Sequence, residues 1–467
     1  MTIPTPIDPD LPVAAARGVE NMEAARAWCR ARGVEDIECI VPDQAGVARG
    51  KLMPAEKFFT ASPMTLPASI FLQTITGDYP EDEAAYVEGI TDGDLILMPD
   101  LSTLAIVPWA SDPTAQVVHD AFRKDGTPVD IAPRRVLQKV LALYDERGLK
   151  PVVAPELEFY LVKPNLDPDY PLEPPVGRSG RPERARQAYS ISAVNEFEAL
   201  FDDVYEFSEA QGLEIDTLAH EDGTAQMEIN LQHGDPVELA DQVFLFKRTI
   251  REAALLHDMH ATFMAKPIAS EPGSAMHIHQ SILDAKTGAN IFSDEDGKAT
   301  PAFYHYIGGL QAYVPNVMCM MAPYVNSYRR LTRNNAAPIN VRWGYDNRTV
   351  GFRVPLSPAE ARRVENRIPS SDANPYLAIA ASLACGYLGL VNAIEPDEPA
   401  DAMVPEDTLT LPRSILDAVR LLEATPELVD IFGEVFVRVY HGIKETEFET
   451  FMGVISPWER EYLLLAV

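Results

Sequence analysis

The sequence predicts an α+β protein with a small β-rich N-terminal domain and a larger domain built around a sheet. The 467 residues leave room for two or three domains, and the 46% hydrophobic content is ample for a buried core. Short strand patterns separated by Pro, Gly and Asp turns dominate the first part of the chain. Four later segments alternate polar and apolar residues, as strands with two different faces do.

The N-terminal 125 residues are expected to contain the β-rich domain. Residues 1–17 have neither a basic region nor an apolar run, which predicts a disordered leader and not a signal peptide. A helix is predicted around 18–32, followed by short strands within 37–54 and 95–109. Turn residues give way to a helical pattern near 123–137. We therefore predict that the domains span 18–125 and 126–467.

Three features organise the second domain. The segment 164–185 is rich in Pro, Gly and charge, and it is expected to form a long surface loop. Asp235 is predicted to cap a helix that begins at Pro236. The uncharged stretch 374–394 is close to membrane-spanning length, but it is rich in Ala and Gly. We expect it to be a buried helix, and we expect no membrane span.

Composition limits the partners and the compartment. A formal charge of −31 and a pI near 4.6 argue against binding to nucleic acid or to an anionic membrane. This charge fits an acidic soluble protein or one that prefers cationic ligands. The four cysteines, Cys29, Cys39, Cys319 and Cys385, show no CxxC spacing, so neither a disulfide framework nor a thiolate zinc site is predicted. A reducing cytoplasm is the simplest expectation.

The four alternating segments each place ionisable or polar side chains on one side of a predicted strand. These side chains are Glu156 and Glu158; Gln226, Glu228 and Asn230; His277, His279 and Ser281; and Arg363, Glu365 and Arg367. One such segment alone is also what an ordinary solvated strand looks like. If all four strands share one sheet, their polar faces converge on a surface with too much charge for a core. Ions or charged ligands are then needed to neutralise it.

The ionisable residues form a set of candidate ligands that is rich in oxygen. The set comprises Glu156, Glu158, Glu221, Glu228, Glu365 and His277. Such hard donors suit Mg²⁺ or Mn²⁺ better than zinc or iron. Nearby in the sequence are arginines suited to phosphate and carboxylate, namely Arg330, Arg348, Arg353, Arg363 and Arg367. Because no P-loop is present, this combination favours phosphoryl transfer from a nucleotide to an acid by an ATP-dependent ligase.

Six segments resemble, in order, the signature blocks of class I glutamine synthetases. They are PELEFYLV, HEDGTAQMEIN, KPIASEPGSAMHIHQS, NSYRRL, NRTVGFRVP and ARRVENRIPSSDANPYLAIAA. The resemblance covers essentially the whole chain. It implies a β-grasp N-terminal domain and a catalytic domain with a curved antiparallel sheet flanked by helices. It also implies a homo-oligomer, a dodecamer of two stacked hexamers with active sites between neighbouring subunits.

The same resemblance implies a role for each candidate residue. One metal ion would be held by Glu158, Glu221 and Glu228, and a second by Glu156, His277 and Glu365. The residues implied around ATP are His279, Ser281, Arg353 and Arg363, and those implied for glutamate are Gly273, Arg330 and Arg367. Arg348 would stabilise the charge that develops when the γ-carboxylate of glutamate is activated as an acyl phosphate and attacked by an amine.

The departures from the family pattern lie mainly on the side of the nucleophile. The D-G-S-S stretch that helps glutamine synthetases bind ammonium is missing; Asp78 could replace its Asp, or it could belong to a solvated acidic loop. The Glu that ends the flap over ammonium is replaced by Ala336, which removes a negative charge and opens space for a larger amine. Pro272 replaces an Asn near glutamate, and this leaves a different acid substrate open. Glu360 replaces a Lys near the nucleotide.

The sequence therefore predicts an ATP-dependent γ-glutamyl amine ligase, with a place in polyamine catabolism or nitrogen metabolism. The amine could be putrescine or another polyamine, ethanolamine or a monoamine. A glutamine synthetase that uses ammonium is the first alternative. A non-catalytic relative with a sensing or structural role is the second, although all six metal ligands are present. Trp343 and Tyr345 could line an amine pocket by cation–π contact, or could simply pack.

Overall fold

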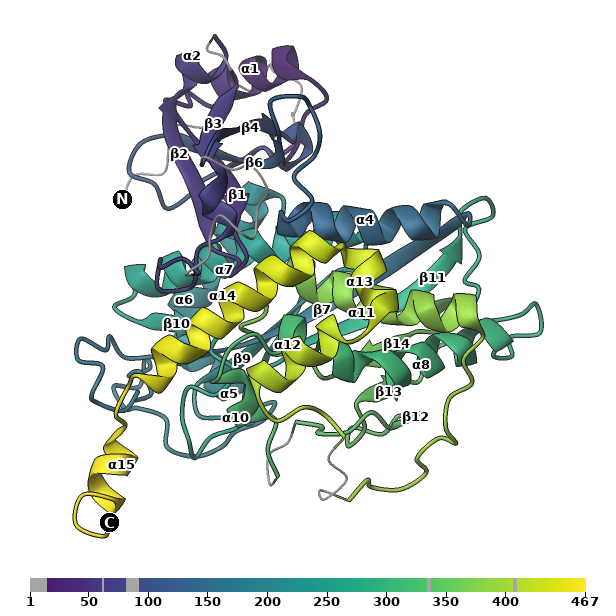
Figure 1. Ribbon diagram of the computed structural model, residues 1–467. Helices are drawn as coiled ribbons and strands as arrows, with labels where there is room; N and C mark the ends of the chain where they lie inside the picture. Colours follow the sequence, from purple (N-terminus) through teal and green to yellow (C-terminus); the bar gives the residue numbers. More distant parts are fainter. Residues whose placement is uncertain (1–14, 61–62, 81–91, 334–336, 406–409) are drawn as a thin grey trace.

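The computed structural model describes residues 15–60, 63–80, 92–333, 337–405 and 410–467 (Figure 1). Most of the predicted leader, 1–17, thus lies outside the described residues. Two sheets organise the rest, one with six strands and one with eight. The predicted α+β class, with a curved sheet flanked by helices, is confirmed. The boundary between 18–125 and 126–467 stays a prediction.

The N-terminal sheet has the strand order β2-β1-β6-β4-β3, and β5 pairs with β6. Its strands are β1 (Asp36–Pro42), β2 (Ala48–Pro54), β3 (Met64–Pro67), β4 (Asp94–Pro99), β5 (Ala105–Ile106) and β6 (Thr114–Phe122). Strands β1 and β2 form an antiparallel hairpin, while β1 runs parallel to β6. Helix α1 (Met22–Ala31) buries Trp28 and Cys29. It begins later than predicted because the side chain of Asn21 caps it.

The larger sheet has the order β12-β13-β14-β11-β7-β9-β8, and β10 pairs with β7. Its strands are β7 (Leu149–Val162), β8 (Ile215–His220), β9 (Gln226–Leu231), β10 (His260–Thr262), β11 (Met276–Asp284), β12 (Trp343–Tyr345), β13 (Phe352–Val354) and β14 (Val364–Asn366). Strands β14, β11, β7 and β9 are antiparallel neighbours. They contain three of the alternating segments and the centre of the fourth, because β14 leaves Arg363 and Arg367 just outside its ends. The prediction that these segments meet in one sheet is confirmed.

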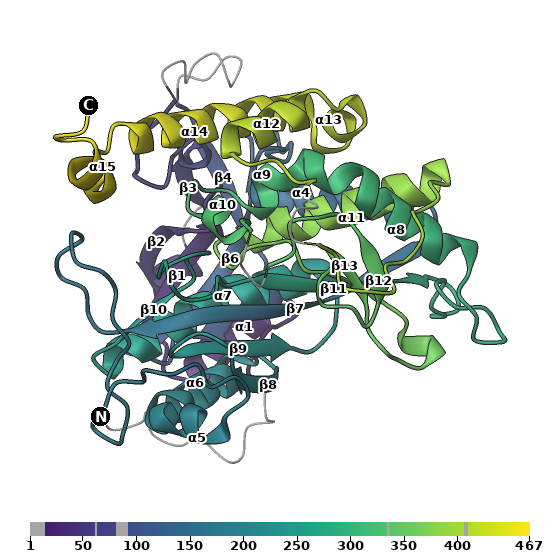
Figure 2. The same cartoon turned by 90° about the horizontal axis from the view of Figure 1, so that it is seen from below.

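Helices pack in layers on the larger sheet (Figure 2). Helices α4 (Pro133–Asp145) and α7 (Pro236–Leu256) pack against β7. Helix α11 (Pro375–Asn392) packs against both α4 and α7. The remaining α-helices of the larger part include α6 (Glu198–Gln211), α8 (Pro301–Tyr313), α10 (Ser327–Arg330), α12 (Ile415–Glu423), α13 (Pro426–Phe432), α14 (Glu434–Met452) and α15 (Pro457–Tyr462). Helix α7 begins where it was predicted, since the carboxylate of Asp235 accepts hydrogen bonds from the N–H groups of Val237 and Glu238.

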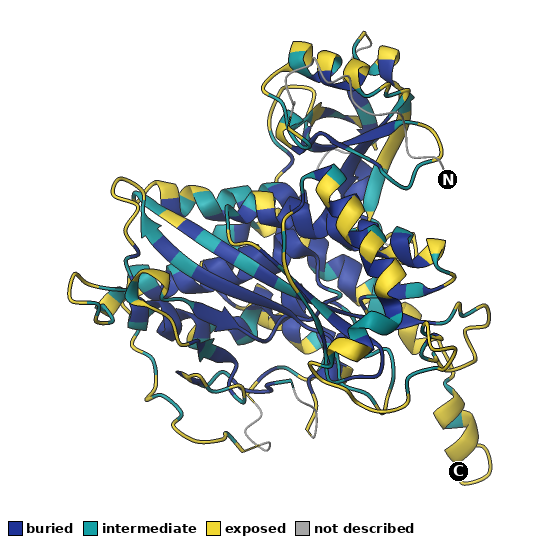
Figure 3. Ribbon diagram, turned by 180° about the vertical axis from the view of Figure 1, so that it is seen from behind, coloured by how far each residue is buried: buried dark blue, intermediate teal, exposed yellow. Residues whose placement is uncertain are grey.

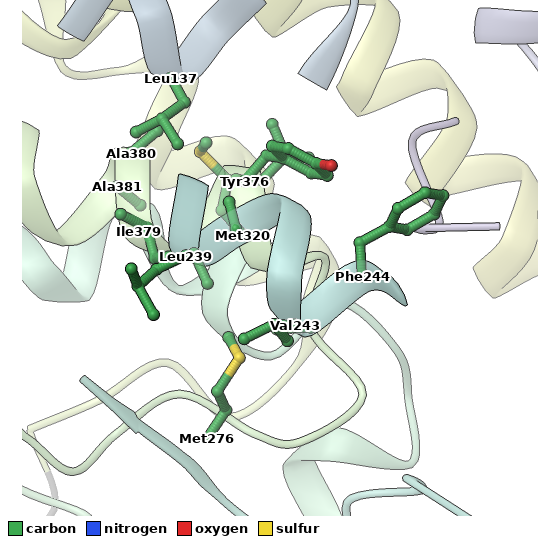
Figure 4. Close-up of a cluster of buried hydrophobic side chains, with 14 of the residues drawn as sticks. Leu137, Leu239, Val243, Phe244, Met276, Met320, Tyr376, Ile379, Ala380 and Ala381 are labelled. Atoms are coloured by element: carbon green, nitrogen blue, oxygen red, sulfur yellow. The ribbon is translucent and has the colours of Figure 1, made fainter. Parts of the chain in front are cut away.

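The core lies between these helices and the sheet, and Figure 3 shows most of the sheet as buried. Helix α11 is long and apolar enough to cross a membrane by composition, but 83% of its most apolar window is buried inside the protein. Its residues Tyr376 and Ile379 lie in a cluster with Leu137 of α4, Val243 of α7 and Met276 of β11 (Figure 4). Helix α11 is therefore the buried helix that its composition predicts.

The predicted surface loop lies between β7 and α5 (Ile191–Val194). Residues 164–185 form turns and extended chain, with one isolated bridge between Val176 and Pro182. Most of its side chains are exposed, which confirms the prediction of a surface loop. Glu183 is an exception, because its carboxylate is buried against His220, the last residue of β8.

Candidate active site

The register of the sheet brings the predicted ligands together. His277 on β11 lies opposite Glu156 on β7, and Glu158 on β7 lies opposite Glu228 on β9. On the other edge of β11, His279 lies opposite Glu365 on β14. Residues paired across neighbouring strands project to the same face of a sheet. The polar sides of the four strands therefore form one continuous surface.

Glu156, His277 and Glu365 form a first group of candidate metal ligands, with donor atoms within 4.8 Å of one another. Nδ1 of His277 lies 3.2 Å from Oε2 of Glu156 and 3.8 Å from Oε1 of Glu365. Burial lowers the pKa of His277 to about 4, so its imidazole is neutral at neutral pH. Neutral imidazole is the form that coordinates a metal ion.

Glu158 and Glu228 form a second group with the same His277, again within 4.8 Å. Burial and the charge of Glu221 together raise the pKa of Glu158 to about 8. Burial also raises the pKa of Glu228 to about 9, together with the charges of Glu156, Glu158 and Glu221. Acids this crowded repel one another unless a cation lies among them. A divalent cation fits this set of hard oxygen donors.

Glu221 belongs to neither of these groups, but its carboxylate interacts with both Glu158 and Glu228. Burial raises its own pKa, although the positive charges of Arg348 and Arg367 partly oppose this. Arg348 is exposed and lies near enough to Glu221 to act on it through its charge. Positive charge thus reaches the acidic cluster from the segment just after β14 and from the loop before β13.

His279 is held between an arginine and a carboxylate. Nε of Arg363 donates to Nδ1 of His279 at 3.1 Å, so the ring proton lies on Nε2. Nε2 lies 2.7 Å from Oε1 of Glu156 and donates to it. Burial alone would raise the pKa of Glu156, but hydrogen bonds from His277 and His279 bring it below its usual value. Ser281 follows on the same face of β11.

Two arginines bind the carboxylate of Glu365. Nη1 of Arg353 donates to Oε2 at 2.7 Å, and Nη1 of Arg367 donates to Oε1. Arg353 also pairs with Asp346 at 2.7 Å. Among the described residues, the Nε–H groups of both arginines are buried and have no hydrogen-bond partner. Each arginine therefore keeps a donor that an anionic substrate could accept from.

Arg330 and Gly273 pack against each other beside the cluster. Arg330 is buried, and its guanidinium donates to the carbonyls of Ile368 at 2.8 Å and Arg367 at 3.1 Å. A Cβ on residue 273 would lie 2.6 Å from both Cγ of Arg330 and the carbonyl oxygen of Ala265. Glycine is required there because the chain approaches both groups so closely. The carbonyl of Gly273 accepts from Nε2 of Gln226 at 3.0 Å.

Of the two residues predicted to act near the amine, the structure describes only Asp78. Asp78 is exposed in a loop of the N-terminal part, where Thr76 Oγ1 donates to its Oδ2 at 2.8 Å. The neighbouring Ile75 N–H donates to Glu447 of α14, on the outer helix layer. In the described part of the chain, Asp78 makes no hydrogen bond with the carboxylate cluster, and its catalytic role stays a prediction. Ala336 of the flap lies outside the described residues.

The side chain of Trp343 packs in the protein interior. Its side chain is 2% exposed, and its Nε1–H donates to the carbonyl of Asp397 at 2.6 Å. Its ring packs edge-on against Phe303, Tyr304 and Tyr345. Tyr345 itself is 46% exposed, so it remains available to a ligand.

Glu183 supports the site from the surface loop, and the sequence analysis missed it. Its Oε2 lies 3.0 Å from Nε2 of His220 and accepts from the N–H of Ala225 at 2.7 Å. Ala225 has a φ of 55°, a left-handed conformation that an Ala rarely adopts. Glu183 therefore closes the turn that carries Glu221 and leads into Glu228. No local pattern marks an acid in a loop rich in Pro and Arg.

Fold and site together define a protein with acids and arginines suited to divalent cations and anionic substrates on one face of a sheet. Residues 130–463 match the model of the glutamine synthetase catalytic domain. Gamma-glutamylputrescine synthetase PuuA of Escherichia coli (strain K12) is 35% identical over 451 residues, which cover 95% of this chain and 94% of the relative. Glutamate–isopropylamine ligase of a Pseudomonas species is 32% identical over 445 residues, 93% of this chain and 96% of the relative.

A solved structure of GmaS without ligand has the same fold. It aligns with a TM-score of 0.79 at 28% sequence identity, over 94% of this chain and 99% of GmaS. The chain belongs to the glutamine synthetase family, and the resemblance found in its sequence blocks is confirmed.

Proposed function

We propose that this chain is an ATP-dependent ligase that joins the γ-carboxylate of glutamate to an organic amine. The observation that carries the proposal is the single polar face formed by β14, β11, β7 and β9, which combines acids, imidazoles and arginines. Two relatives that align over more than nine-tenths of the chain bear the names of a glutamylputrescine synthetase and a glutamate–isopropylamine ligase. These names favour an organic amine as the nucleophile.

The chemistry requires two displacements. A γ-carboxylate oxygen of glutamate attacks the terminal phosphorus of ATP, which forms γ-glutamyl phosphate and releases ADP. The amine nitrogen then attacks the acyl carbon, loses a proton and displaces phosphate. Arg348 is assigned to the charge that develops on the acyl phosphate, since its guanidinium acts on the cluster through Glu221. Gly273, Arg330 and Arg367 are assigned to glutamate.

Two divalent cations, Mg²⁺ or Mn²⁺, are assigned to the acidic cluster. Glu158, Glu221 and Glu228 would hold one, while Glu156, His277 and Glu365 would hold the other. The bound cations would neutralise the phosphate oxygens of ATP. The residues assigned to the nucleotide are His279, Ser281, Arg353 and Arg363. The buried Nε–H of Arg353, which lacks a partner among the described residues, supports this assignment.

Three further assignments concern the compartment, the oligomeric state and the role of Asp78. We place the protein in the cytoplasm, because all four cysteines are free and buried. We assign it to a dodecamer of two stacked hexamers on the family pattern. In such an assembly Asp78, which makes no hydrogen bond with its own cluster among the described residues, would serve the site of a neighbouring subunit.

The test is phosphate release from ATP with glutamate and Mg²⁺ or Mn²⁺. Ammonium, ethanolamine, putrescine, spermidine and isopropylamine are supplied in turn, and product masses are recorded. Turnover with an organic amine well above that with ammonium is expected, with a product mass equal to glutamate plus amine minus water. Turnover with ammonium alone would instead identify a glutamine synthetase.

A further inference from the structure

A cavity with a mixed apolar and charged lining lies where the N-terminal part meets the helices of the larger part. Its volume is about 330 Å³, within the range of small-molecule sites. It is lined by the turn between β1 and β2, by α7, by the segment after β10 and by the segment before α11. None of its lining residues belongs to those assigned to metal, ATP or glutamate.

Two cations one helical turn apart on α7 line this cavity, Lys247 and Arg251. Both lie against the ring of Phe263, with Nζ of Lys247 5.5 Å and Cζ of Arg251 5.0 Å from its centroid. In the described ranges, neither cation has a carboxylate within 4.0 Å. Like charges at this spacing repel each other. Burial and the charge of Arg251 lower the pKa of Lys247 to about 7.

The acid that lines the cavity, Asp372, accepts its hydrogen bonds from groups other than these two cations, although its charge acts on Lys247. Oδ2 of Asp372 accepts from the hydroxyl of Ser327 at 2.8 Å and from the N–H of Ala265 at 3.4 Å. Lys247 donates instead to the carbonyls of Ser371 at 2.6 Å and Ala373 at 3.0 Å. With a pKa of about 7, Lys247 is only partly protonated at neutral pH, so the guanidinium of Arg251 is the main positive charge that an anion could approach.

The apolar part of the lining indicates that the ligand also has an apolar part. Much of the lining is hydrocarbon, including Phe244, Phe263, Met264, Ile75 and Pro375. An inorganic anion would leave these surfaces against water, whereas a carboxylate with an alkyl chain would cover them. Arg251 is exposed at the edge of the cavity, so its fork of donors is accessible to a carboxylate that enters.

We propose that this cavity binds a small carboxylate whose anionic group lies at Lys247 and Arg251 and whose alkyl chain packs on Phe244 and Phe263. The inference is independent of which amine the enzyme uses.

The experiment is calorimetric titration of the full chain with pentanoate, in a buffer free of other carboxylates and of phosphate. Saturable binding is expected. Arg251→Gln, which changes an exposed side chain, should weaken it at least 10-fold, and Lys247→Met should do the same. Arg438→Gln removes an exposed charge on α14, away from the cavity, and it should bind pentanoate like the parent protein.

Two other compounds test the alkyl chain and the anionic group of the ligand separately. Pentanol has the same alkyl chain without charge and should show no saturable binding, whereas inorganic phosphate should bind more weakly than pentanoate. The proposal is overturned if pentanoate does not bind, or if both cavity variants bind it like the parent protein, which would place it at the glutamate site. Phosphate that binds more tightly than pentanoate and depends on Arg251 would also overturn the carboxylate assignment.

Discussion

The carboxylate of Glu183 holds the turn that presents Glu221. Glu183→Ala leaves the buried ring of His220 and the N–H of Ala225 without this partner, a loss that costs about 1–3 kcal/mol for a buried group. Residues that orient metal ligands typically change metal affinity by about 10–100-fold. We expect Glu183→Ala to raise the Mg²⁺ concentration for half-maximal activity about 10-fold.

Glu183→Gln is the matched control, because its amide oxygen can still accept from Ala225. It should retain a metal requirement closer to that of the parent protein. The measurement is phosphate release over a Mg²⁺ titration at saturating ATP and glutamate. A lower melting temperature with an unchanged metal requirement would mean that Glu183 only stabilises the loop.

The raised pKa values of Glu158 and Glu228 predict how metal and pH act together. Acids whose pKa is higher in the folded than in the unfolded protein stabilise the fold at low pH, and this contribution is lost as pH rises through the folded pKa. With pKa values of about 8 and about 9, the metal-free protein should lose melting temperature between pH 6 and 9.

A divalent cation binds the ionised acids, so Mg²⁺ should raise the melting temperature more at pH 8.5 than at pH 6. Thermal denaturation in EDTA and in Mg²⁺ at both pH values checks this. Equal metal-induced shifts at the two pH values would contradict the assigned cluster.

At the scale of single elements, local pattern was sufficient to predict much of the structure. Alternation along a strand has period two, so the chemical faces of β7, β9, β11 and β14 could be predicted from neighbouring residues alone. The order of these strands could not, because pairing joins His277 to Glu156 across more than a hundred residues. The role of Glu183 could not be predicted for the same reason, because its partner His220 lies on a strand beyond the surface loop.

Helix α7 offers a test of a locally encoded element. The Asp235 carboxylate accepts from the N–H groups of Val237 and Glu238, so Asp235→Ala removes the cap and should cost about 1 kcal/mol. Asp235→Asn keeps an acceptor oxygen and should cost less. Urea unfolding of the three proteins measures this difference, and equal midpoints for Asp235→Ala and the parent would show that the cap contributes nothing.

At the scale of the whole molecule, Arg134 joins the N-terminal sheet to helix α7, which packs against the larger sheet. Arg134 of α4 pairs with Asp100 at 2.5 Å and Asp120 at 2.8 Å in the N-terminal part, and with Asp241 of α7 at 2.9 Å. Its side chain is 5% exposed. Removing one partner from a buried ionic network costs about 3–5 kcal/mol, because the remaining charges stay buried without compensation.

Arg134→Met should therefore lower the free energy of unfolding by about that amount, and it should loosen the N-terminal sheet before the larger one. Arg135→Met is the control, since Arg135 is partly exposed and its pairing with Asp130 is long, at 3.5 Å. Urea unfolding gives the stability, and amide hydrogen exchange compares β4 and β6 with β7 and β11. If exchange rises equally in both sheets, Arg134 stabilises the fold without specifically joining its two parts.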